Sequence, residues 1–375
     1  MDEITEKRRR INTFLDSHHL DALYLCQVSN FAWITAGLEP VVMLSSDRAE
    51  AGLLITPDKS YVICNTVELP RLRDEDCLGE QGYEFYQTPW YHGMPEFHDL
   101  VKGKKWASDW PMAGAIDLSG ELARLRFQLT PAEVERYRWV GLHTAKALEI
   151  AARAVRPGMS EVQIAGLIAT QAYDVGITPT LLLVGTDERI FRYRHPIPTL
   201  KSLERYAMLV ICGRRWGLVA SATRLVHFGS LPDELKQKQT ACAFVDATFN
   251  VATVVGVKVS DIFKRASKAY SEVGFPDEWM KHNQGGSAGY MSRDYEGTPD
   301  CDETVMEEQG FAWNPSITGV KSEDTMIVHS AGSEFITVTG EWPSLCVQLD
   351  DERDRDISST IKKRNWERPA ILTYD

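Results

Sequence analysis

The sequence predicts an α+β fold in two parts, a smaller α/β domain over residues 1–125 and a larger α+β domain over residues 126–350. In the first part, helical and strand-like patterns alternate along the chain. In the second part, two helices, a run of strands, two more helices and further strands follow one another, which indicates an α+β layout. The remaining residues, 351–375, are dense in charge and are expected to form an exposed C-terminal tail.

Four segments define the first part. Residues 7–17 have the apolar spacing of a helix, and the run LDALYLC at residues 20–26 suits a buried strand. The segments AGLLITP (51–57) and KSYVICN (59–65) are expected to be two strands joined by a turn at Pro57, Asp58 and Lys59. A small sheet flanked by helices follows from this pattern.

Two capping boxes mark the start of the second part. Thr130 and Glu133 begin a helix that runs to about residue 155, and Ser160 and Gln163 begin another that runs to about residue 175. Strand-like runs are expected at 178–185, 206–213, 217–229, 310–317 and 325–329, interrupted by helices at 234–250 and 260–273.

Composition excludes several functional classes. The net charge is −12 and the isoelectric point is near 5.3, which argues against a nucleic-acid partner because such proteins carry a basic surface. No apolar run approaches the roughly 20 residues that span a bilayer, so no membrane partner is expected. The acidic N-terminal segment lacks the apolar core of a secretion signal, and the seven cysteines form no C-x-x-C pair. These features predict a reduced, cytoplasmic protein.

Ordered motifs carry a family resemblance. DALYLCQVSNFAWITAG at residues 21–37, and PGMSEVQIA at residues 157–165 after a long helix, resemble the creatinase/prolidase/methionine-aminopeptidase (pita-bread) superfamily. The resemblance implies a pita-bread C-terminal domain preceded by the smaller N-terminal domain of creatinase, prolidase and aminopeptidase P. It also implies a homodimer, in which the N-terminal domain of one subunit reaches toward the site of the other.

The peptidases of this superfamily hold two divalent metal ions with two Asp, one His and two Glu. Aligning on Thr223 and Arg224 of LVICGRRWGLVASATRLVHFG leaves no aspartate for the first pair, since none occurs from residue 207 to residue 229. By this resemblance the five ligand positions fall on Val210, Ser221, Gly286, Asn314 and Glu323.

Only Glu323 keeps a metal-binding side chain of the expected type. Two dications about 3.7 Å apart repel by about 18 kcal/mol at an effective dielectric of about 20, and bridging carboxylates normally offset this repulsion. A single glutamate cannot offset it. We therefore expect no dinuclear metal site, no metal ligands and no cofactor.

The resemblance assigns chemistry to His195, in the segment FRYRHPIPT. In creatinase, which works without metal, the matching histidine is the catalytic acid/base, and a neutral imidazole with a pKa near 6.5 suits that role. Glu323 would then orient His195 or the attacking water. The alternative is a loop histidine that only hydrogen-bonds a neighbour.

An acidic group on the substrate is expected from the arginines near these motifs. Arg293 falls either at the family's second histidine or at the arginine that holds the substrate carboxylate in creatinase, and Arg194 is a second candidate to hold the anion. Arg194 could equally be a solvated loop charge. Arg224 occupies the position of the family's structural arginine, for which an internal ion pair is the better interpretation.

The other candidate substrate-binding residues either are uncharged or are expected to lie beside the site. Asn314, Ser221 and Thr223 replace charged residues and suit a polar, less cationic ligand than creatine, whose cation would lack a partner carboxylate. His282 lies beside the site by resemblance, although a core histidine is the favoured alternative. Trp313 is a candidate pocket wall unless it packs in the core. In a dimer, the loop ending at Arg48 would reach the partner's site.

Three functional hypotheses remain. The first is a metal-independent hydrolase of a C–N bond in a small molecule that bears an acidic group, with His195 as general acid/base. The second is a non-catalytic protein that binds a ligand or a partner. The third is a metallopeptidase of the Xaa-Pro type with displaced ligands, which the four altered ligand positions disfavour.

Overall fold

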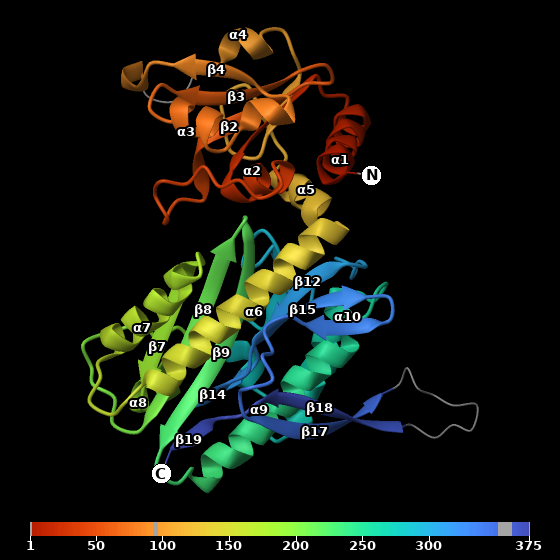
Figure 1. The fold of residues 1–375 in the computed structure, drawn as a ribbon. Coiled ribbons are helices and arrows are strands. Elements are labelled where there is room, and N and C mark those ends of the chain that lie inside the picture. The colour runs from red at the N-terminus through yellow and green to blue at the C-terminus, as the bar shows by residue number, and fades with distance from the viewer. Residues whose placement is uncertain (1, 93–96, 352–361, 375) are drawn as a thin grey trace. The chain divides into compact units, whose positions relative to one another are not determined.

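The computed structural model describes residues 2–92, 97–351 and 362–374. The chain divides into two compact units, Met1–Glu133 with Trp216–Leu218, and Val134–Arg215 with Val219–Asp375. The sequence placed a domain boundary at residue 125, shortly before this division. Each unit is described below by itself (Figure 1).

The first unit is built on a six-stranded sheet with the order β4-β3-β2-β1-β5-β6. Its strands are β1 (Ala22–Gln27), β2 (Arg48–Ile55), β3 (Ser60–Asn65), β4 (Glu84–Thr88), β5 (Trp106–Ser108) and β6 (Ile116–Asp117). Its helices are α1 (Glu3–His18), α2 (Val28–Ile34), α3 (Leu69–Asp74), α4 (His98–Val101) and α5 (Ser119–Ala123), with 3-10 turns at Leu78–Gln81, Trp90–His92 and Arg124–Arg126.

The predicted hairpin of the first unit is confirmed. Strands β2 and β3 are antiparallel, Ile55 is paired with Ser60, and Thr56 closes the turn by donating its backbone N–H to the carbonyl oxygen of Lys59 at 2.8 Å. The apolar run in β1 is buried as expected, because it lies between β2 and β5.

The second unit contains the long helices and most of the strands. Its helices are α6 (Pro131–Ala154), α7 (Glu161–Asp174), α8 (Glu188–Arg192), α9 (Asp233–Ala252) and α10 (Val259–Glu272), with a 3-10 turn at Glu278–Lys281. Its strands are β7 (Thr178–Thr186), β8 (Tyr206–Arg215), β9 (Leu218–Phe228), β10 (Gly285–Ser287), β11 (Tyr295–Glu296), β12 (Gln309–Trp313), β13 (Ser316–Ile317), β14 (Val320–Lys321), β15 (Asp324–His329), β16 (Gly332–Phe335), β17 (Ser344–Asp351), β18 (Lys362–Pro369) and β19 (Leu372–Tyr374).

Both capping boxes form as predicted. Thr130 donates its backbone N–H to the Glu133 carboxylate at 2.7 Å, and the Glu133 N–H donates to the Thr130 hydroxyl at 3.4 Å. Ser160 and Gln163 exchange the same pair of hydrogen bonds at the start of α7. These bonds satisfy backbone groups that have no partner within the helix, which explains why α6 and α7 begin where the sequence indicated.

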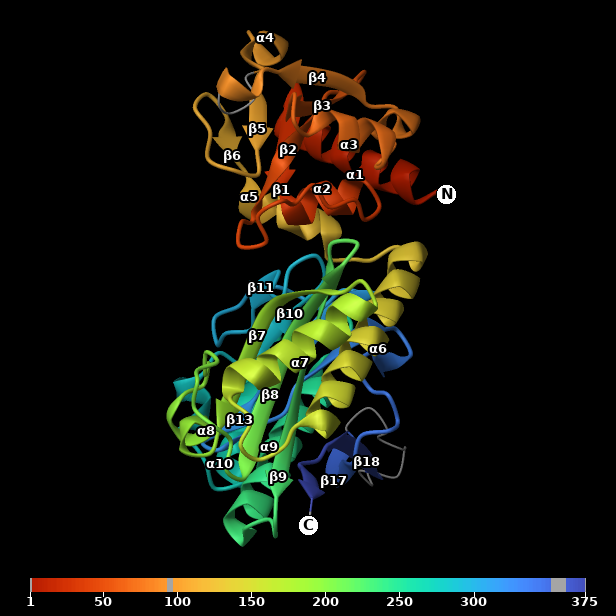
Figure 2. The ribbon, with the colours of Figure 1, turned by 60° about the vertical axis from the view of Figure 1, so that its left-hand side comes forward.

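Helices cover both faces of the central strand β8. Alternate residues of a strand point to opposite faces, and Leu209 and Ile211 of β8 pack in one apolar cluster with residues of α6 and α7. Met208 and Val210 pack instead in a second cluster with residues of α9, α10, β12 and β15. Figure 2 shows α6 and α7 on the first of these faces. This layering agrees with the α+β layout of helices and strands that the sequence predicted for the second part.

The strands form a four-stranded sheet, β19-β9-β8-β7, and a five-stranded sheet, β11-β10-β12-β15-β16. Strand β12 is antiparallel to both β10 and β15, with Trp313 paired to Gly285 on one side and to Asp324 on the other. Short pairs β13-β14 and β17-β18 complete the unit. The ends of β12, β14 and β15 carry the candidate site.

The expectation of an exposed C-terminal tail is wrong for part of residues 365–374, where Arg368 and Ile371 are buried within or next to strands. Strand β18 pairs with β17 along its whole length, and β19 pairs in parallel with β9. Arg368 of β18 is buried, with an exposure of 1%. Charge density suggested solvation, but this arginine has buried carboxylate partners that the sequence pattern does not reveal. The expected tail also includes residues 352–361, which lie outside the described residues.

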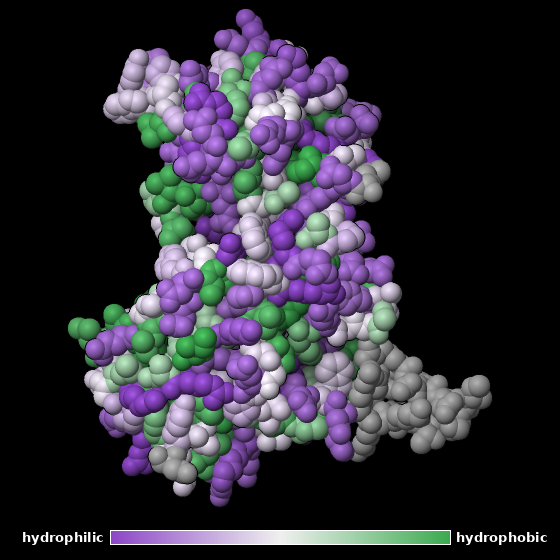
Figure 3. All heavy atoms as spheres, in the orientation of Figure 1, coloured by the Kyte–Doolittle hydropathy of each residue, from purple (hydrophilic) through white to green (hydrophobic). Residues whose placement is uncertain are grey.

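Two further observations concern the surface and the thiols. Within the described part of the chain, no helix is both long enough and apolar enough to cross a membrane. On the face drawn in Figure 3, small groups of hydrophobic residues lie among hydrophilic residues. All seven cysteines are free thiols, and four of them are buried.

Candidate functional site

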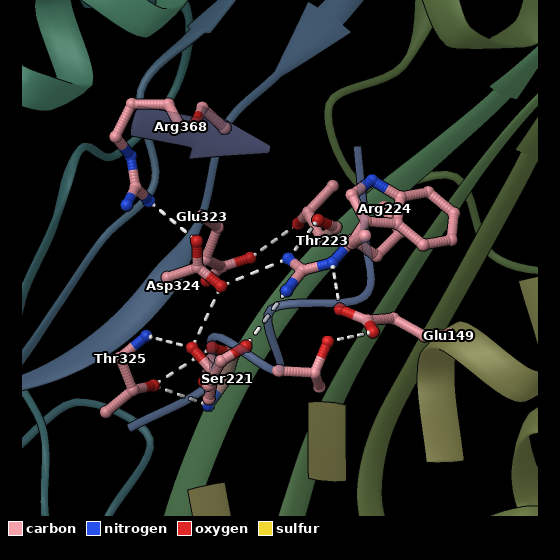
Figure 4. Close-up of polar contacts among 12 residues, drawn as sticks. Glu149, Ser221, Thr223, Arg224, Glu323, Asp324, Thr325 and Arg368 are labelled. Atoms are coloured by element: carbon pink, nitrogen blue, oxygen red, sulfur yellow. Dashed lines mark hydrogen bonds and ion pairs between the residues drawn. The ribbon is translucent and has the colours of Figure 1, made fainter. Parts of the chain in front are cut away.

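The predicted site residues come together around Glu323, which directly precedes β15. The Glu323 side chain is 2% exposed, and cations lie at both of its carboxylate oxygens. Arg293 Nη2 lies 3.1 Å from Oε1, and Lys321 Nζ lies 2.9 Å from Oε2. Thr223 Oγ1 donates a hydrogen bond to Oε2 at 2.7 Å, as Figure 4 shows. Burial alone would raise the pKa of Glu323, but Lys321 and Arg293 outweigh it and lower the pKa to about 2.

Strand β9 fixes the position of Glu323. The Thr223 N–H donates to the Glu323 carbonyl oxygen at 3.1 Å. Ser221 of β9 and Thr325 of β15 form a second link between the same two segments. The Ser221 N–H donates to Thr325 Oγ1 at 2.8 Å, and the Thr325 hydroxyl donates to the Ser221 carbonyl oxygen at 2.9 Å. Ser221 Oγ lies 3.2 Å from the buried thiol of Cys212. Thr223 therefore contacts Glu323 directly, whereas Ser221 holds the backbone that carries it.

A buried network of ion pairs lies behind Glu323 (Figure 4). Arg224 pairs with Glu149 and with Asp324, each at 3.0 Å, which confirms the predicted internal ion pair of Arg224. Arg368 pairs with Asp324 at 2.8 Å and with Asp246 at 2.6 Å. The network therefore ties helices α6 and α9 and strands β9 and β18 to the first residue of β15.

His195 and His282 form a pair at this site. Their Nε2 atoms lie 3.1 Å apart, and their rings meet edge to face with centroids 5.0 Å apart. Nδ1 of His282 lies 3.2 Å from the hydroxyl of Ser316. One of the two Nε2 atoms must carry the proton of the bond between the rings, because two unprotonated nitrogens cannot hydrogen-bond each other. His195 is exposed, whereas His282 is half-buried.

Both histidines are held in the neutral form. Burial lowers the pKa of His282 to about 3, with further contributions from Lys321 and His195. Burial and the charge of Lys321 also lower the pKa of His195, while Glu323 acts in the opposite direction. A neutral imidazole can accept a proton at neutral pH, so the pair has the protonation state that a general base needs.

Arg194 is not placed as predicted. Its guanidinium donates to the carboxylate of Glu278 and to the hydroxyl of Thr318 at 2.9 Å. Thr318 also donates its backbone N–H to Glu278 at 2.9 Å, so the pair is held in place. The pKa of Glu278 is about 2 because Lys281, Thr318 and Arg194 outweigh the effect of burial. Arg194 therefore has a carboxylate partner within the chain, and it takes part in holding the loop that carries Thr318.

Trp313 belongs to the core and is no pocket wall. It is fully buried, its ring stacks on Phe249 with centroids 4.5 Å apart, and its Nε1–H donates to Thr253 Oγ1 at 2.9 Å. Adjacency to Asn314 in the sequence suggested the pocket, but successive residues of an extended segment point to opposite sides.

Asn314 has an unusual environment. The residue is 4% exposed, and its Oδ1 has no hydrogen-bond partner within the described residues. Its backbone N–H donates to the Gln284 carbonyl at 3.0 Å, and its Nδ2 lies 3.5 Å from Asn283 Oδ1. Asn283 adjoins His282 in the sequence, so the Asn314 amide lies near the segment that carries this histidine. A buried acceptor without a partner costs about 1–3 kcal/mol, which a ligand N–H could recover.

The donor set does not suit a pair of divalent ions. Val210 packs in the apolar core, and a Cβ at Gly286 would lie only 2.3 Å from the Tyr295 carbonyl oxygen, so a larger side chain does not fit there. Across the residues that the structure covers, no group of three or more His, Cys, Asp and Glu side chains could hold a metal ion. Glu323 already has a cation at each oxygen.

One predicted residue, Arg48, remains to be placed, and one residue of the site was missed. Arg48 begins β2 in the first unit, opposite Gln27, and its role in a partner's site stays a prediction. Lys321 was not predicted. The signal was its position two residues before Glu323 in GVKSEDT, because residues i and i+2 of an extended segment lie on the same face.

A cavity of about 400 Å³ adjoins the histidine pair. His282 and Asn283 contribute to its wall together with Phe263, Trp279 and Met280, and Gly297 lines another part of it. The cavity therefore combines apolar groups with polar groups that neighbour the candidate site.

The layers of the second unit and the position of this site define the pita-bread class, and the fold is that of a peptidase/prolidase-type hydrolase. The profile of Metallopeptidase family M24 matches residues 135–330, more than half of the chain. The chain belongs to Metallopeptidase family M24.

Similar proteins are distant in sequence. An uncharacterized peptidase of Staphylococcus haemolyticus (strain JCSC1435) is 21% identical over 333 residues, which cover 82% of this chain and 94% of that protein. The Xaa-Pro dipeptidase from Bacillus anthracis superimposes with a TM-score of 0.74 at 20% identity, covering 91% of this chain and 98% of that one. The prolidase from Pyrococcus horikoshii OT3 gives a TM-score of 0.74 at 16% identity, with coverages of 89% and 98%.

The N-terminal domain of the FACT complex subunit SPT16 from Cicer arietinum also shares the fold, with a TM-score of 0.64 at 12% identity and coverages of 90% and 97%. Likeness at these identities concerns the fold alone. The fold and superfamily predicted from the sequence are confirmed.

Proposed function

We propose that the protein is a metal-independent hydrolase that cleaves a C–N bond in a small molecule bearing an acidic group. The observation that carries the proposal is the pair of neutral histidines, with Nε2 atoms 3.1 Å apart, beside a glutamate whose two oxygens are each paired with a cation. The pair supplies a general acid/base without a metal ion. Glu323, with a pKa of about 2, takes no part in proton transfer and instead holds Lys321 and Arg293.

The histidine pair offers two proton arrangements. In one, His282 donates from Nδ1 to Ser316 and accepts at Nε2 from His195, which leaves His195 Nδ1 free to take a proton from water. In the other, Ser316 donates to His282 Nδ1, His282 donates from Nε2 to His195, and His195 Nδ1 carries a proton for the leaving nitrogen. The contacts of 3.1 and 3.2 Å allow both arrangements. His195 would therefore act first as a base and then as an acid.

Asn314 suits the nitrogen side of the scissile bond. Its buried Oδ1 can accept a hydrogen bond from an amide or amine N–H of the substrate, and its Nδ2 contacts Asn283, the neighbour of His282 in the sequence. A creatine-like cation would lack a partner carboxylate at Thr223 and Asn314, and the Thr223 hydroxyl already donates a hydrogen bond to Glu323. A neutral amide thus fits better than a guanidinium.

A panel of small acidic amides tests the proposal, with release of the amine measured in the presence and absence of a chelator. The wild-type protein should turn over at least one amide equally in both conditions. His195→Ala should lower kcat by about 10²-fold or more, the usual contribution of a general acid/base. His98→Gln, an exposed histidine of the first unit, is the matched control and should not change kcat. Turnover that stops on chelation, or persists in His195→Ala, would overturn the proposal.

A binding protein without catalysis is the second candidate. Its support is the shared fold of the FACT complex subunit, together with the internal pairing of Glu323 by this chain's own cations. If no amide is turned over while small acidic ligands still raise the melting temperature, this second function is the better one.

A further inference from the structure

We propose that Lys321 and Arg293 form an oxyanion-binding subsite in which the substrate's acidic group, a carboxylate or a phosphate, is held without a metal ion. This inference deepens the proposed function and rests on it for the identity of the substrate, although the subsite itself can be tested without turnover. The observations concern charge, hydrogen-bond donors and access.

The three charged groups in mutual contact have a net charge of +1. Lys321 and Arg293 each carry one positive charge, and Glu323 carries the single negative charge between them. Glu278, another acid of this unit, is paired with Arg194 and with the exposed Lys281, and no ion pair described joins it to Lys321 or Arg293. Behind Glu323, the carboxylate of Asp324 is paired with both Arg224 and Arg368. One cationic charge in direct contact with Glu323 therefore lacks an anion.

Lys321 has more N–H donors than described ion-pair partners. An ammonium group carries three N–H donors, and Glu323 Oε2 is the partner of Lys321 Nζ within the described residues, at 2.9 Å. The side chain is only 4% exposed, so water meets little of it. A buried ammonium with one carboxylate partner is costly unless further acceptors approach it. An oxyanion would supply them.

Exposure differs among the residues of the site. His195 is exposed, the Arg293 side chain is 16% exposed, and the side chains of Lys321 and Glu323 are 4% and 2% exposed. The positive charge of Lys321 also lowers the pKa of both histidines. An anion held by Lys321 and Arg293 would therefore act electrostatically on the acid/base pair.

The partnerless acceptor of Asn314 gives a second, independent indication of a ligand. Its Oδ1 is buried and hydrogen-bonds nothing among the residues described, although its neighbours Gln284 and Asn283 are engaged. Cationic donors together with a partnerless amide oxygen match a molecule that has an acidic group and an N–H. Substrates of this class include N-acyl amino acids and acidic amides.

Calorimetric titration with inorganic phosphate, and separately with acetate, tests the subsite at constant ionic strength with chloride as the reference ion. Lys321→Met lowers the net charge of the cluster from +1 to 0 and should weaken phosphate binding about tenfold or more. Glu323→Gln raises the charge to +2 and should strengthen binding by a similar factor. Opposite signs cannot arise from misfolding, which weakens binding in both variants.

The double variant Lys321→Met/Glu323→Gln restores the net charge of +1 through Arg293 and should bind phosphate within a few-fold of the wild-type protein. Lys264→Met, an exposed lysine of α10, is the control and should bind as the wild type does. The inference is overturned if neither phosphate nor acetate binds the wild-type protein more tightly than chloride, or if both single variants shift affinity in the same direction. Phosphate binding without any amide turnover would leave the subsite standing and sink the proposed hydrolase.

Discussion

Replacing Arg368 by Met tests whether the C-terminal strand is part of the second unit's core. Arg368 is 1% exposed and pairs with Asp246 at 2.6 Å and Asp324 at 2.8 Å, and both of these carboxylates are buried. Removing one partner of a buried ion pair costs about 3–5 kcal/mol, because the other charge remains without its counterion. Methionine has a similar length and no charge, so the change removes the ion pairs while it retains most of the packing.

The two aspartates should respond differently. Asp324 keeps Arg224 at 3.0 Å and the hydroxyl of Thr337 at 2.9 Å. Asp246 keeps hydrogen bonds from Ser322 and Asn250 but loses the cation that is paired with it. Most of the expected loss of about 3–5 kcal/mol therefore arises at Asp246.

The loss should depend on pH. Burial already raises the pKa of Asp246, and Arg368 is the largest influence that lowers it. Without Arg368 that pKa rises further, so Asp246 takes up a proton in the folded variant and the unpaired charge disappears as pH falls. We expect the difference in stability between variant and wild type to be larger at pH 8 than at pH 5.

Amide hydrogen exchange provides the assay, because it reports the free energy of opening for each unit separately. Peptides from α9 and β15 should lose protection in Arg368→Met, whereas peptides from the first unit should not. Lys268→Met, whose side chain is 78% exposed in α10, is the control and should change the opening free energy by less than about 0.5 kcal/mol. A loss below about 1 kcal/mol in α9 and β15, or a loss equal at both pH values, would refute the reasoning.

Three further predictions follow from the site and the core. The pKa of His282 is about 3 in the folded protein against an ordinary value of 6.5, so the unfolded chain binds more protons between these two pH values. The free energy of unfolding should therefore fall as pH drops from 6.5 toward 3. Urea unfolding of His282→Gln should show a weaker dependence on pH. Elemental analysis of protein equilibrated with Mn²⁺ and then desalted should find far less than one ion per chain, and two ions per chain would contradict the assigned donor set. Trp313→Ala should cost about 3–5 kcal/mol in the second unit, whereas a pocket wall would cost far less.

Local signals in the sequence were sufficient for most of the fold. The capping boxes at Thr130 and Ser160 and the turn between β2 and β3 depend on residues within a few positions of each other. The apolar runs of β8 and β9 are continuous because helices or strands cover both faces, and such runs identify buried strands without knowledge of their partners. Interactions of this kind can be read from one segment at a time.

The wrong predictions instead concern residues whose partners are far away in the sequence. Arg194 and Glu278 are 84 positions apart, and Arg368 and Asp246 are 122 apart. A charged residue looks solvated in the sequence unless its partner is known, and these partners come from other elements. Trp313 was misassigned for a related reason, because its direction depends on the pairing of β12 with β10 and β15.

The segment from residue 321 to residue 324 connects the site with the ion network, because its side chains point alternately to one and to the other. Lys321 and Glu323 contact each other at the site. Ser322 and Asp324 point the other way, to Asp246 in one case and to Arg224 and Arg368 in the other. An extended segment alternates in this manner, so the ion network that holds Ser322 and Asp324 also fixes the positions of Lys321 and Glu323 at the site.

Arg368 should therefore act as a positioning residue for the subsite, although it contacts neither Lys321 nor Glu323 directly in any ion pair described. If so, Arg368→Met should weaken phosphate binding several-fold at pH 8 and less at pH 5, in parallel with the opening of β15 measured by exchange. Lys321→Met should weaken phosphate binding while leaving the exchange of α9 nearly unchanged, because Glu323 retains Arg293 and Thr223. Phosphate affinity that stays at the wild-type value in Arg368→Met, despite lost protection in β15, would show that the network stabilises the fold without placing the site.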